Sequence, residues 1–434
     1  MKFYSTNSPD EKVDLKQAVT QGLAPDNGLY MPEVIPRLPQ SFFDSLGRIS
    51  FQEIGVAVAR NLLGDSIPDT ELVRIVNHTI QFDAPLVALE QDIFALELFH
   101  GPTLAFKDFG ARFMSQLLGY FASQQDQEVV ILVATSGDTG SAVANGFLGV
   151  AGIRVVVLYP TGKVSDIQEK QFTTLGQNIT ALEIDGTFDD CQKLVKESFL
   201  DADLKKKFAL TSANSINIAR LIPQSFYYFH GYGQLSDKSK PVAFCVPSGN
   251  FGNVTGGLLA QRMGLPISQL IAATNSNDVV PEFFRTHVFK PRPSQQTISN
   301  AMDVGNPSNI VRMIDLYKGD IEAMVSGIKG YAFSDDETKE AMNTVFAEHH
   351  YTMDPHGAIA YMGVKRFMEE SNLPCTGIFL ETAHPAKFKE VVEAAIGEPV
   401  AVPPTLQKFL SREKKTIRLD KDFEAIKDFM LNRF

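Results

Sequence analysis

The sequence predicts an α/β fold with two open, mostly parallel sheets and an N-terminal accessory region. Continuous apolar runs such as EVVILVA (128–134) and IRVVVLY (153–159) have the composition of buried parallel strands. A helical pattern follows each run, and strands that alternate with helices at this spacing require right-handed βαβ crossovers. A hydrophilic segment, GQLSDKSKP (233–241), separates this series from a second one. The chain therefore reads as two α/β domains.

The individual elements follow from hydrophobic periodicity. In the first series we expect strands at 128–134, 153–159, 179–184 and 208–211, and helices at 142–147, 164–175, 189–200 and 216–232. A strand at 93–98 precedes this series. In the second series we expect strands at 242–246, 270–273 and 377–380, and helices at 254–262, 338–349, 358–368, 385–395 and 421–434. The first 90 residues show helical patterns near 51–63 and 69–77.

These patterns divide the chain into four parts. Residues 1–90 form the accessory region, and residues 116–233 form a small α/β domain. Residues 91–115 and 234–410 together form a large domain, and residues 411–434 form a C-terminal helix. In open parallel sheets, ligands bind outside the carboxyl ends of the strands. We therefore expect the functional residues in the loops that follow the strands.

Composition excludes several classes of function. The net charge of −11 argues against a nucleic-acid or anionic-membrane surface. The mean hydropathy of −0.05 is that of globular material, and no stretch approaches the ~18 apolar residues that a membrane span needs. The three cysteines, Cys191, Cys245 and Cys375, are far apart and odd in number. Buried free thiols in a reducing, cytoplasmic setting fit best.

One lysine stands out in the stretch LELFHGPTLAFKDFGARF (96–113), where a helical period begins at Thr103 or Leu104. On a helical wheel Lys107 lands on an apolar face, among Ala111, Met114 and Leu118. Burial lowers the pKa of a lysine, and a helix N-terminus acts in the same direction. Both effects favour a neutral, nucleophilic amine. The alternative is a first-turn lysine that reaches into solvent.

Two strand-to-helix loops have the composition of anion sites. The first is SGNFGN (248–253), whose glycines and helix N-terminus suit a phosphate, although such loops also serve as plain turns. It is neither a Walker A loop nor a GxGxxG fingerprint. The second is TSGDTG (135–140), where hydroxyls and amides at a helix start suit a carboxylate or a phosphate. Its DTG triplet occurs once and in βαβ surroundings, which excludes an aspartic protease.

The histidines contribute less to this interpretation. His349, His350 and His356 lack the spacing of metal ligands, so we expect no metal site. His100 precedes the lysine turn, where either a ligand contact or a structural hydrogen bond is open. Thr382 ends a predicted strand in ETAH (381–384), where its hydroxyl could face a ring nitrogen. An activated lysine, a phosphate cradle and a carboxylate loop together point toward pyridoxal phosphate.

Six blocks of sequence carry a resemblance to a known family. They are FHGPTLAFKDFGARF, ATSGDTGSA, VPSGNFGNVTGGLLA, ATNSNDVVP, SNAMDVGNPSN and ETAHPAKF, in that order between about residues 75 and 390. Together they resemble the threonine synthase family, in its longer form with an extended N-terminal region. The resemblance implies the fold-type-II pyridoxal phosphate architecture, similar to the tryptophan synthase β chain. It also implies conversion of O-phospho-L-homoserine and water to L-threonine and phosphate.

The resemblance implies a role for individual residues. Lys107 matches the Schiff-base lysine, and Thr382 matches the hydroxyl partner of the pyridine nitrogen. The loop around the cofactor phosphate is matched by Ser248, Gly249, Asn250, Phe251, Gly252 and Asn253. The loop for the substrate's α-carboxylate is matched by Thr135, Ser136, Gly137, Asp138 and Thr139. Asn253 stands where many relatives carry aspartate, which removes a charge near the phosphate and should leave binding intact.

The donors to the substrate phosphate stay open. Lys163, at the start of a helix after a strand, is the first candidate. Arg154 and the turn with Ser299, Asn300 and Asp303 are the others. A lysine at such a position can equally lie in water.

Two rival functions share part of this pattern. A serine/threonine dehydratase or an O-acetylserine sulfhydrylase has the same fold and cofactor, but usually carries asparagine where this chain has Asp138, and lacks the HGPT-AFKD block. A non-catalytic member that binds pyridoxal phosphate is the other rival, and the intact Lys107 argues against it. We expect a monomer or a homodimer.

Overall fold

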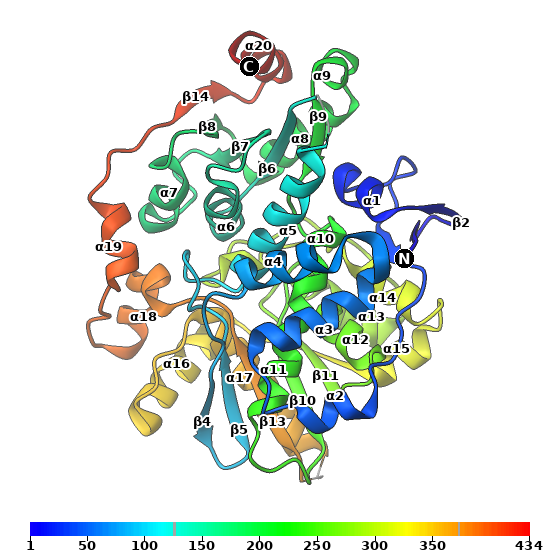
Figure 1. Cartoon of the computed structure of the whole chain (residues 1–434). Coiled ribbons are helices and arrows are strands. Elements are labelled where there is room, and N and C mark those ends of the chain that lie inside the picture. Colours follow the sequence, from blue (N-terminus) through cyan, green and yellow to red (C-terminus); the bar gives the residue numbers. More distant parts are fainter. Residues whose placement is uncertain (125–126, 372–373) are drawn as a thin grey trace. The chain divides into compact units, whose positions relative to one another are not determined.

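The structure is a computed structural model that describes residues 1–124, 127–371 and 374–434. The chain divides into two compact units. The first unit consists of residues 1–33, 107–220 and 402–434, which are dark blue, cyan to green, and red in Figure 1. The second unit consists of residues 34–106 and 221–401. The expected boundaries after residues 90, 115 and 233 differ from these. Segments 1–33 and 107–115 both belong to the first unit.

The first unit is built around a parallel sheet. Within the described residues this sheet has five strands in the order β14-β8-β7-β6-β9. The elements of the unit are β1 (Phe3–Ser5), β2 (Ser8–Val13), α1 (Leu15–Gln21), β3 (Tyr30–Pro32), α5 (Lys107–Ala122), β6 (Val129–Ala134), α6 (Asp138–Phe147), β7 (Ile153–Pro160), α7 (Asp166–Thr173), β8 (Ile179–Asp185), α8 (Phe188–Leu200), α9 (Ala202–Lys207), β9 (Ala209–Ser212), α19 (Pro404–Leu410), β14 (Ile417–Asp420) and α20 (Phe423–Arg433).

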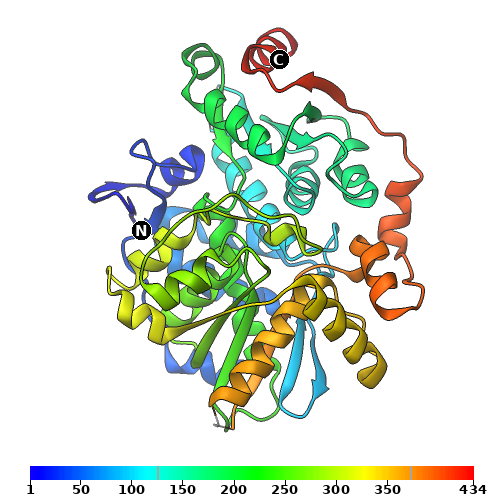
Figure 2. The same ribbon diagram turned by 180° about the vertical axis from the view of Figure 1, so that it is seen from behind.

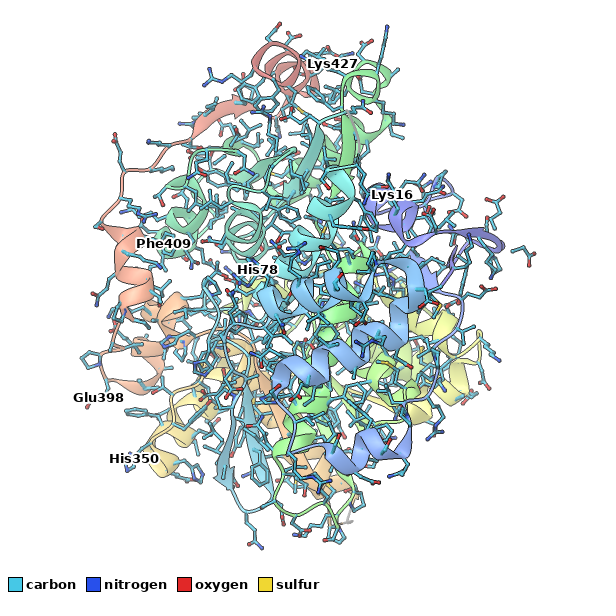
Figure 3. The ribbon with its side chains drawn as sticks, in the orientation of Figure 1. Lys16, His78, His350, Glu398, Phe409 and Lys427 are labelled. Atoms are coloured by element: carbon cyan, nitrogen blue, oxygen red, sulfur yellow. The ribbon has the colours of Figure 1, made fainter. Side chains whose placement is uncertain are left out.

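Alternation along the strands explains how one face of this sheet is covered. Val130 and Leu132 of β6 and Val156 and Leu158 of β7 point to the same face. They pack in one buried cluster with residues of α8, α9 and α20. Lys427 of α20, labelled in Figure 3, adds ion pairs of 2.8 and 2.7 Å to the two aspartates at the start of α9.

The helix expected at 421–434 is confirmed by α20 (Phe423–Arg433), whereas the assignment of all of residues 411–434 to a C-terminal helix is wrong in its first half. Ile417–Asp420 is a strand, β14, that pairs in parallel with β8, and the helix begins at Phe423. Four residues are too few for their alternation to be recognised in the sequence. The small antiparallel sheet β2-β1-β3 was missed for a related reason, since the β2 segment SPDEKV is almost entirely polar.

The second unit is built around a mixed sheet. Within the described residues this sheet has six strands in the order β12-β11-β10-β13-β5-β4, and only the β4–β5 pair is antiparallel. The elements of the unit are α2 (Gln40–Ser45), α3 (Phe51–Leu63), α4 (Asp69–Thr79), β4 (Leu86–Glu90), β5 (Ile93–Glu97), α11 (Phe226–Gln234), β10 (Val242–Pro247), α12 (Gly252–Arg262), β11 (Ile267–Thr274), α13 (Val279–Thr286), α14 (Ile310–Leu316), α15 (Ile321–Gly327), β12 (Ile328–Ala332), α16 (Asp335–His349), α17 (Pro355–Ser371), β13 (Thr376–Glu381) and α18 (Lys389–Ile396), with 3-10 helices at Gly64–Ser66, Ile222–Ser225, Asn300–Met302 and Pro385–Phe388.

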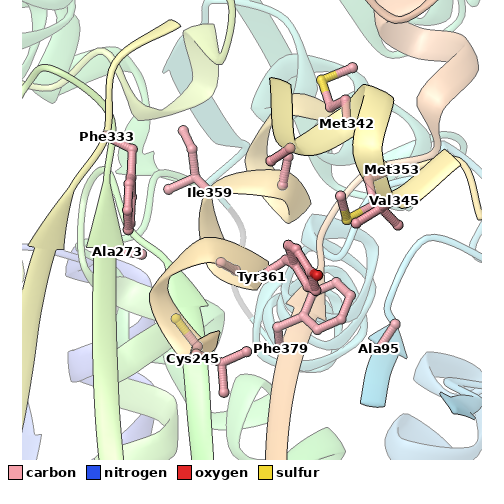
Figure 4. Packing of buried hydrophobic residues seen from close by; sticks show 14 of the residues in the cluster. Ala95, Cys245, Ala273, Phe333, Met342, Val345, Met353, Ile359, Tyr361 and Phe379 are labelled. Carbon is pink, nitrogen blue, oxygen red and sulfur yellow. The ribbon is translucent and has the colours of Figure 1, made fainter. Parts of the chain in front are cut away.

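Helix α17 covers one face of this sheet and forms much of its core. It lies along β13, β10 and β11, as Figure 2 shows from behind. Its residues Ile359 and Tyr361 pack with Cys245, Ala273 and Phe379 of these strands (Figure 4). Gly363 makes this close approach possible, because a Cβ there would lie 2.7 Å from the Cys245 sulfur.

Several predicted helices needed correction. The helix expected at 385–395 begins as a 3-10 helix, Pro385–Phe388, and continues as α18 from Lys389. The expected helix at 216–232 is interrupted, since α10 (Ile218–Leu221) is followed by a 3-10 helix before α11 begins. Pro223 lies in that 3-10 segment, and a proline cannot donate the helical hydrogen bond. The helix expected from Thr103 begins instead at Lys107, because Leu104 has a left-handed φ of 56°.

Candidate active site

Lys107 is the first residue of α5, in the first unit. Ala111, Met114 and Leu118 on the same side of the helix are fully buried, as the helical wheel predicts. The Lys107 side chain is 17% exposed, and its Nζ lies 3.9 Å from Oδ2 of Asp138. The amine is therefore largely enclosed and stands beside a carboxylate.

Asp138 begins α6 and is held by a residue far away in the sequence. The Gln168 side-chain amide donates to Asp138 Oδ1 at 2.8 Å. Gln168 also packs on Gly137, whose φ is 140° and where a Cβ would lie 2.6 Å from the Gln168 side chain. With one oxygen toward Gln168 and the other toward Lys107, Asp138 orients the lysine. It is a poor residue for holding a substrate carboxylate.

The other residues of the TSGDTG loop divide into two groups. The Thr135 hydroxyl accepts from the amides of Gly137 and Gly140 at 2.9 and 2.8 Å, so Thr135 shapes the loop. Ser136 and Thr139 are partly exposed at the N-terminus of α6. Hydroxyls and first-turn amides at a helix N-terminus are groups that can donate to an anion.

The residues just before Lys107 are tied to the end of β13, within the second unit. The Phe106 amide donates to the carbonyl of Thr382 at 2.9 Å, and the His384 amide donates to the Leu104 carbonyl at 3.1 Å. The buried Lys387 donates to the Thr103 carbonyl at 2.8 Å. Lys107 follows Phe106 directly in the chain. The 382–387 segment thus fixes the chain from which Lys107 emerges.

His384 in this segment makes the free energy of unfolding depend on pH. Burial lowers the pKa of His384 to about 4. The unfolded chain takes up this proton near pH 6.5, so it binds more protons than the folded chain below that pH, and stability falls from pH 6.5 toward 4. His384→Asn keeps an acceptor for the Ala386 amide and is expected to flatten this fall in urea titrations at pH 7 and pH 4.5. His350→Asn, at an exposed left-handed position, is the control. An unchanged pH slope in His384→Asn would contradict the assignment.

The 248–253 loop belongs to the second unit and joins β10 to α12. Ser248 is 2% exposed, and its hydroxyl donates to the Val246 carbonyl at 2.9 Å. Phe251, the residue before α12, has a left-handed φ of 58°, which turns successive amides toward one side of the loop. A Cβ on Gly249 would lie 2.7 Å from Cα of Met302, so only glycine fits there.

Side chains from two other segments fix this loop. Asn253 Oδ1 accepts from the Tyr227 and Tyr228 hydroxyls at 2.6 and 3.0 Å. Burial raises the pKa of both tyrosines, so they remain donors. Asn250 Oδ1 accepts from the Ser308 amide at 2.5 Å, and Asn309 donates to the Asn250 carbonyl at 3.0 Å.

A phosphate group fits this loop. The buried Asn253 Nδ2 has no hydrogen-bond partner among the residues that the structure describes, although burying such a donor is costly. The loop also presents the N-terminus of α12, whose first amides lack helical acceptors. An anion at this point satisfies both.

The candidates for the substrate phosphate are placed differently from one another. Lys163 is exposed in the turn after β7. Arg154 pairs with Glu128 at 3.0 Å and stacks on the Phe434 ring, so it is already engaged. Asn275 donates to the Ser299 hydroxyl at 3.0 Å, in a buried network with Asp303. Asn300 is partly buried, and its Oδ1 has no partner within the described residues.

The structure also places the remaining titratable residues. His100 Nε2 lies 2.7 Å from a Glu97 carboxylate oxygen, which favours the structural alternative for this histidine. Among the described residues, no group of three or more histidine, cysteine, aspartate or glutamate side chains is placed to hold a metal ion. Within the same residues no helix has both the length and the apolar character that crossing a membrane requires.

The chain is similar to known proteins along its whole length. A family model described as pyridoxal-phosphate dependent enzyme matches residues 72–374. Models described as threonine synthase N terminus and threonine synthase, C-terminal match residues 2–80 and 357–430. The threonine synthase of Escherichia coli is 45% identical over 433 residues and covers 100% of both chains.

Solved structures show the same likeness. The crystal structure of the Escherichia coli threonine synthase superposes with a TM-score of 0.92 at 43% identity, and covers 100% of both chains. The pyridoxal-phosphate-bound threonine synthase of Brucella melitensis gives a TM-score of 0.92 at 34% identity, over 100% of this chain and 99% of that one. The fold and the lysine- and phosphate-type loops thus define a fold-type-II enzyme that uses pyridoxal phosphate. Within that class, the chain belongs to the threonine synthase family.

Proposed function

We propose that this chain converts O-phospho-L-homoserine and water into L-threonine and phosphate. The observation that carries the proposal is the enclosed Lys107 amine beside Asp138, in a chain that matches threonine synthases over its full length. When bound, pyridoxal phosphate supplies the electron sink for carbanions at successive substrate carbons. The rest of the chemistry falls to the side chains of this chain.

Each group of residues has a distinct task in this proposal. Lys107 would hold the cofactor covalently, and its amine, once free, would move protons to and from the substrate. The 248–253 loop holds the cofactor phosphate through Asn253 and the start of α12. Thr382, 5% exposed at the end of β13, offers a neutral hydroxyl to the pyridine nitrogen. A neutral partner limits electron withdrawal and so suppresses transamination.

Two sets of residues are assigned to the substrate in this proposal. Ser136 and Thr139, with the amides of the 135–140 loop, bind the α-carboxylate at the start of α6. For the substrate phosphate we retain Lys163, which is exposed in the turn after β7, and Asn300, whose side-chain Nδ2 can donate to an anion. Ser299 instead supports that turn, since Asn275 already donates to its hydroxyl.

The deciding assay supplies purified holoenzyme with phosphohomoserine and measures both products. Equal amounts of inorganic phosphate and threonine support the proposal. Formation of a 2-oxo acid from serine or threonine, without threonine synthesis, would identify a dehydratase. Formation of cysteine from O-acetylserine and sulfide would identify a sulfhydrylase. Absence of turnover in a chain that holds the cofactor would identify a non-catalytic relative.

Asp138→Asn is expected to shift the pH titration of the bound cofactor's visible absorbance. The carboxylate 3.9 Å from Nζ stabilises the protonated nitrogen, so its removal should lower the midpoint by about one pH unit. Asp166→Asn removes a carboxylate at a matching 3.8 Å from Lys170 and serves as the control. An unchanged midpoint in Asp138→Asn would assign this residue to the substrate alone.

Two properties of the whole protein belong to the same proposal. The three cysteines are free and buried, which supports a reducing, cytoplasmic compartment. Light scattering of the purified chain tests the expectation of a monomer or a homodimer.

A further inference from the structure

A chain of buried polar side chains lies behind the 248–253 loop, within the second unit. Glu381 is the last residue of β13 and directly precedes Thr382. Glu381 and Asp354 are fully buried, and His356 is 3% exposed. The reaction proposed above uses none of the three. Burying an ionisable side chain costs free energy, so the presence of these three buried groups calls for a function.

Asp354 keeps its charge because it caps α17. It accepts from the amides of His356 and Gly357 at 2.9 and 3.3 Å, and from His356 Nδ1 at 2.5 Å. Burial opposes ionisation, but the His356 ring and these donors outweigh it and hold the pKa of Asp354 below its usual value. A helix N-terminus adds to this preference for an anion.

Glu381 is in the opposite situation. Its carboxyl lies beside the Asp354 carboxylate, and a Cβ on Gly357 would lie 2.1 Å from its Oε1. Burial, and then the neighbouring Asp354 charge, raise the pKa of Glu381 well above its usual value. A neutral carboxyl is itself a donor, and Asp354 is the acceptor beside it. The proton of this pair therefore stays on Glu381.

His356 connects Asp354 to the turn on which the 248–253 loop rests. The Ala301 amide donates to His356 Nε2 at 3.3 Å, so Nε2 carries a lone pair and the ring proton is on Nδ1. Ala301 belongs to the 3-10 turn Asn300–Met302. A Cβ on Gly249 would lie 2.9 Å from the Ala301 carbonyl oxygen and 2.7 Å from Cα of Met302. The loop thus rests directly on the turn that His356 holds.

We propose that Glu381, Asp354 and His356 are positioning residues for the cofactor phosphate, acting through the Ala301–Met302 turn on Gly249. The proposal rests on the proposed function, because it assumes that the 248–253 loop binds that phosphate. Glu381 is joined to Thr382 by a peptide bond, so the same chain of contacts also fixes the strand end beside the cofactor ring. The cofactor's two ends are then aligned by one buried network.

Two variants of His356 separate this role from simple packing. Glutamine places an oxygen near the position of Nε2 and can still accept from the Ala301 amide, whereas asparagine is too short. We expect His356→Asn to raise the dissociation constant for pyridoxal phosphate about tenfold, and His356→Gln to stay within about threefold of wild type. The phosphorus NMR signal of the bound phosphate should shift in the asparagine variant and return in the glutamine variant.

The other two members supply variants that keep the fold. Asp354→Asn retains a good helix cap but loses the charge that orients His356, and should weaken cofactor binding about as much as His356→Asn. Glu381→Gln stays neutral and keeps a donor, so cofactor affinity should stay within about threefold from pH 6 to 9. The other charged or titratable groups around Glu381 and Asp354 are Glu97, His100, Tyr351, His384 and Lys387. They are unchanged in every variant.

The outcomes are distinct. Wild-type affinity in both His356→Asn and Asp354→Asn, or equal damage in His356→Asn and His356→Gln, would overturn the proposal. If the cofactor affinity of Glu381→Gln differed from that of wild type in a strongly pH-dependent way, Glu381 would be ionised in the wild type. That result would also overturn the proposal. A wild-type enzyme that makes no threonine would instead count against the proposed function. The order of cofactor affinities among these variants does not depend on that activity, so the two failures can be told apart.

Discussion

Replacing Lys107 with alanine is expected to abolish covalent attachment of pyridoxal phosphate and to lower kcat by roughly 10²–10⁴-fold. The lysine amine both holds the cofactor and moves the substrate's protons in the proposed reaction, and alanine does neither. The measurement is the mass of the protein after borohydride reduction, together with phosphate release from phosphohomoserine. Attachment should disappear even where the cofactor still binds through its phosphate.

The control is a lysine of similar length in a different setting. Lys206 is exposed on α9, in the same unit, and Lys206→Ala should keep both attachment and activity. If Lys107→Ala still carried a reducible cofactor, another lysine would be the attachment point. The assignment of the α5 N-terminus would then be wrong.

The second large effect is expected at Gly249. An added Cβ in Gly249→Ala would meet two backbone atoms, Cα of Met302 at 2.7 Å and the Ala301 oxygen at 2.9 Å. Backbone cannot rotate away as a side chain can, so the loop must move. Overpacking of this kind costs about 1–3 kcal/mol. If the cost falls on the bound conformation, the dissociation constant for pyridoxal phosphate rises about tenfold or more.

Gly119→Ala is the matched control, because it adds the same methyl group within α5. There the Cβ would meet one methyl of Val150 at 3.0 Å, which can turn aside. Alanine also favours a helix over glycine by about 1 kcal/mol. Cofactor affinity should stay unchanged in this variant. Equal affinity in Gly249→Ala and wild type would remove the 248–253 loop from the phosphate site.

What the sequence could predict was local. The buried face of α5 follows from a period of 3.6 residues, and Ala111, Met114 and Leu118 are buried as expected. The parallel strands β6 and β7 follow from apolar runs. Both kinds of signal lie within about ten residues of chain.

What the sequence could not predict depended on contacts across long separations. Gln168 lies 30 residues beyond Asp138, and neither pattern nor composition connects them. The turn with Ser299 was one candidate for the substrate phosphate, yet Asn275 from another strand end already donates to the Ser299 hydroxyl. His356 was weighed only as a metal ligand, because its partner Ala301 is 55 residues away. Spacing in sequence carries no information about such partners.

The pairing of β14 with β8 bears on how the chain folds during synthesis. The first unit draws on residues 1–33, 107–220 and 402–434, so its edge strand β14 is synthesised long after β8. Until then β8 presents unpaired backbone groups, which invite association with other chains. Contacts between segments so far apart in sequence form slowly, so we expect the β8 edge to stay unpaired while the intervening chain is made.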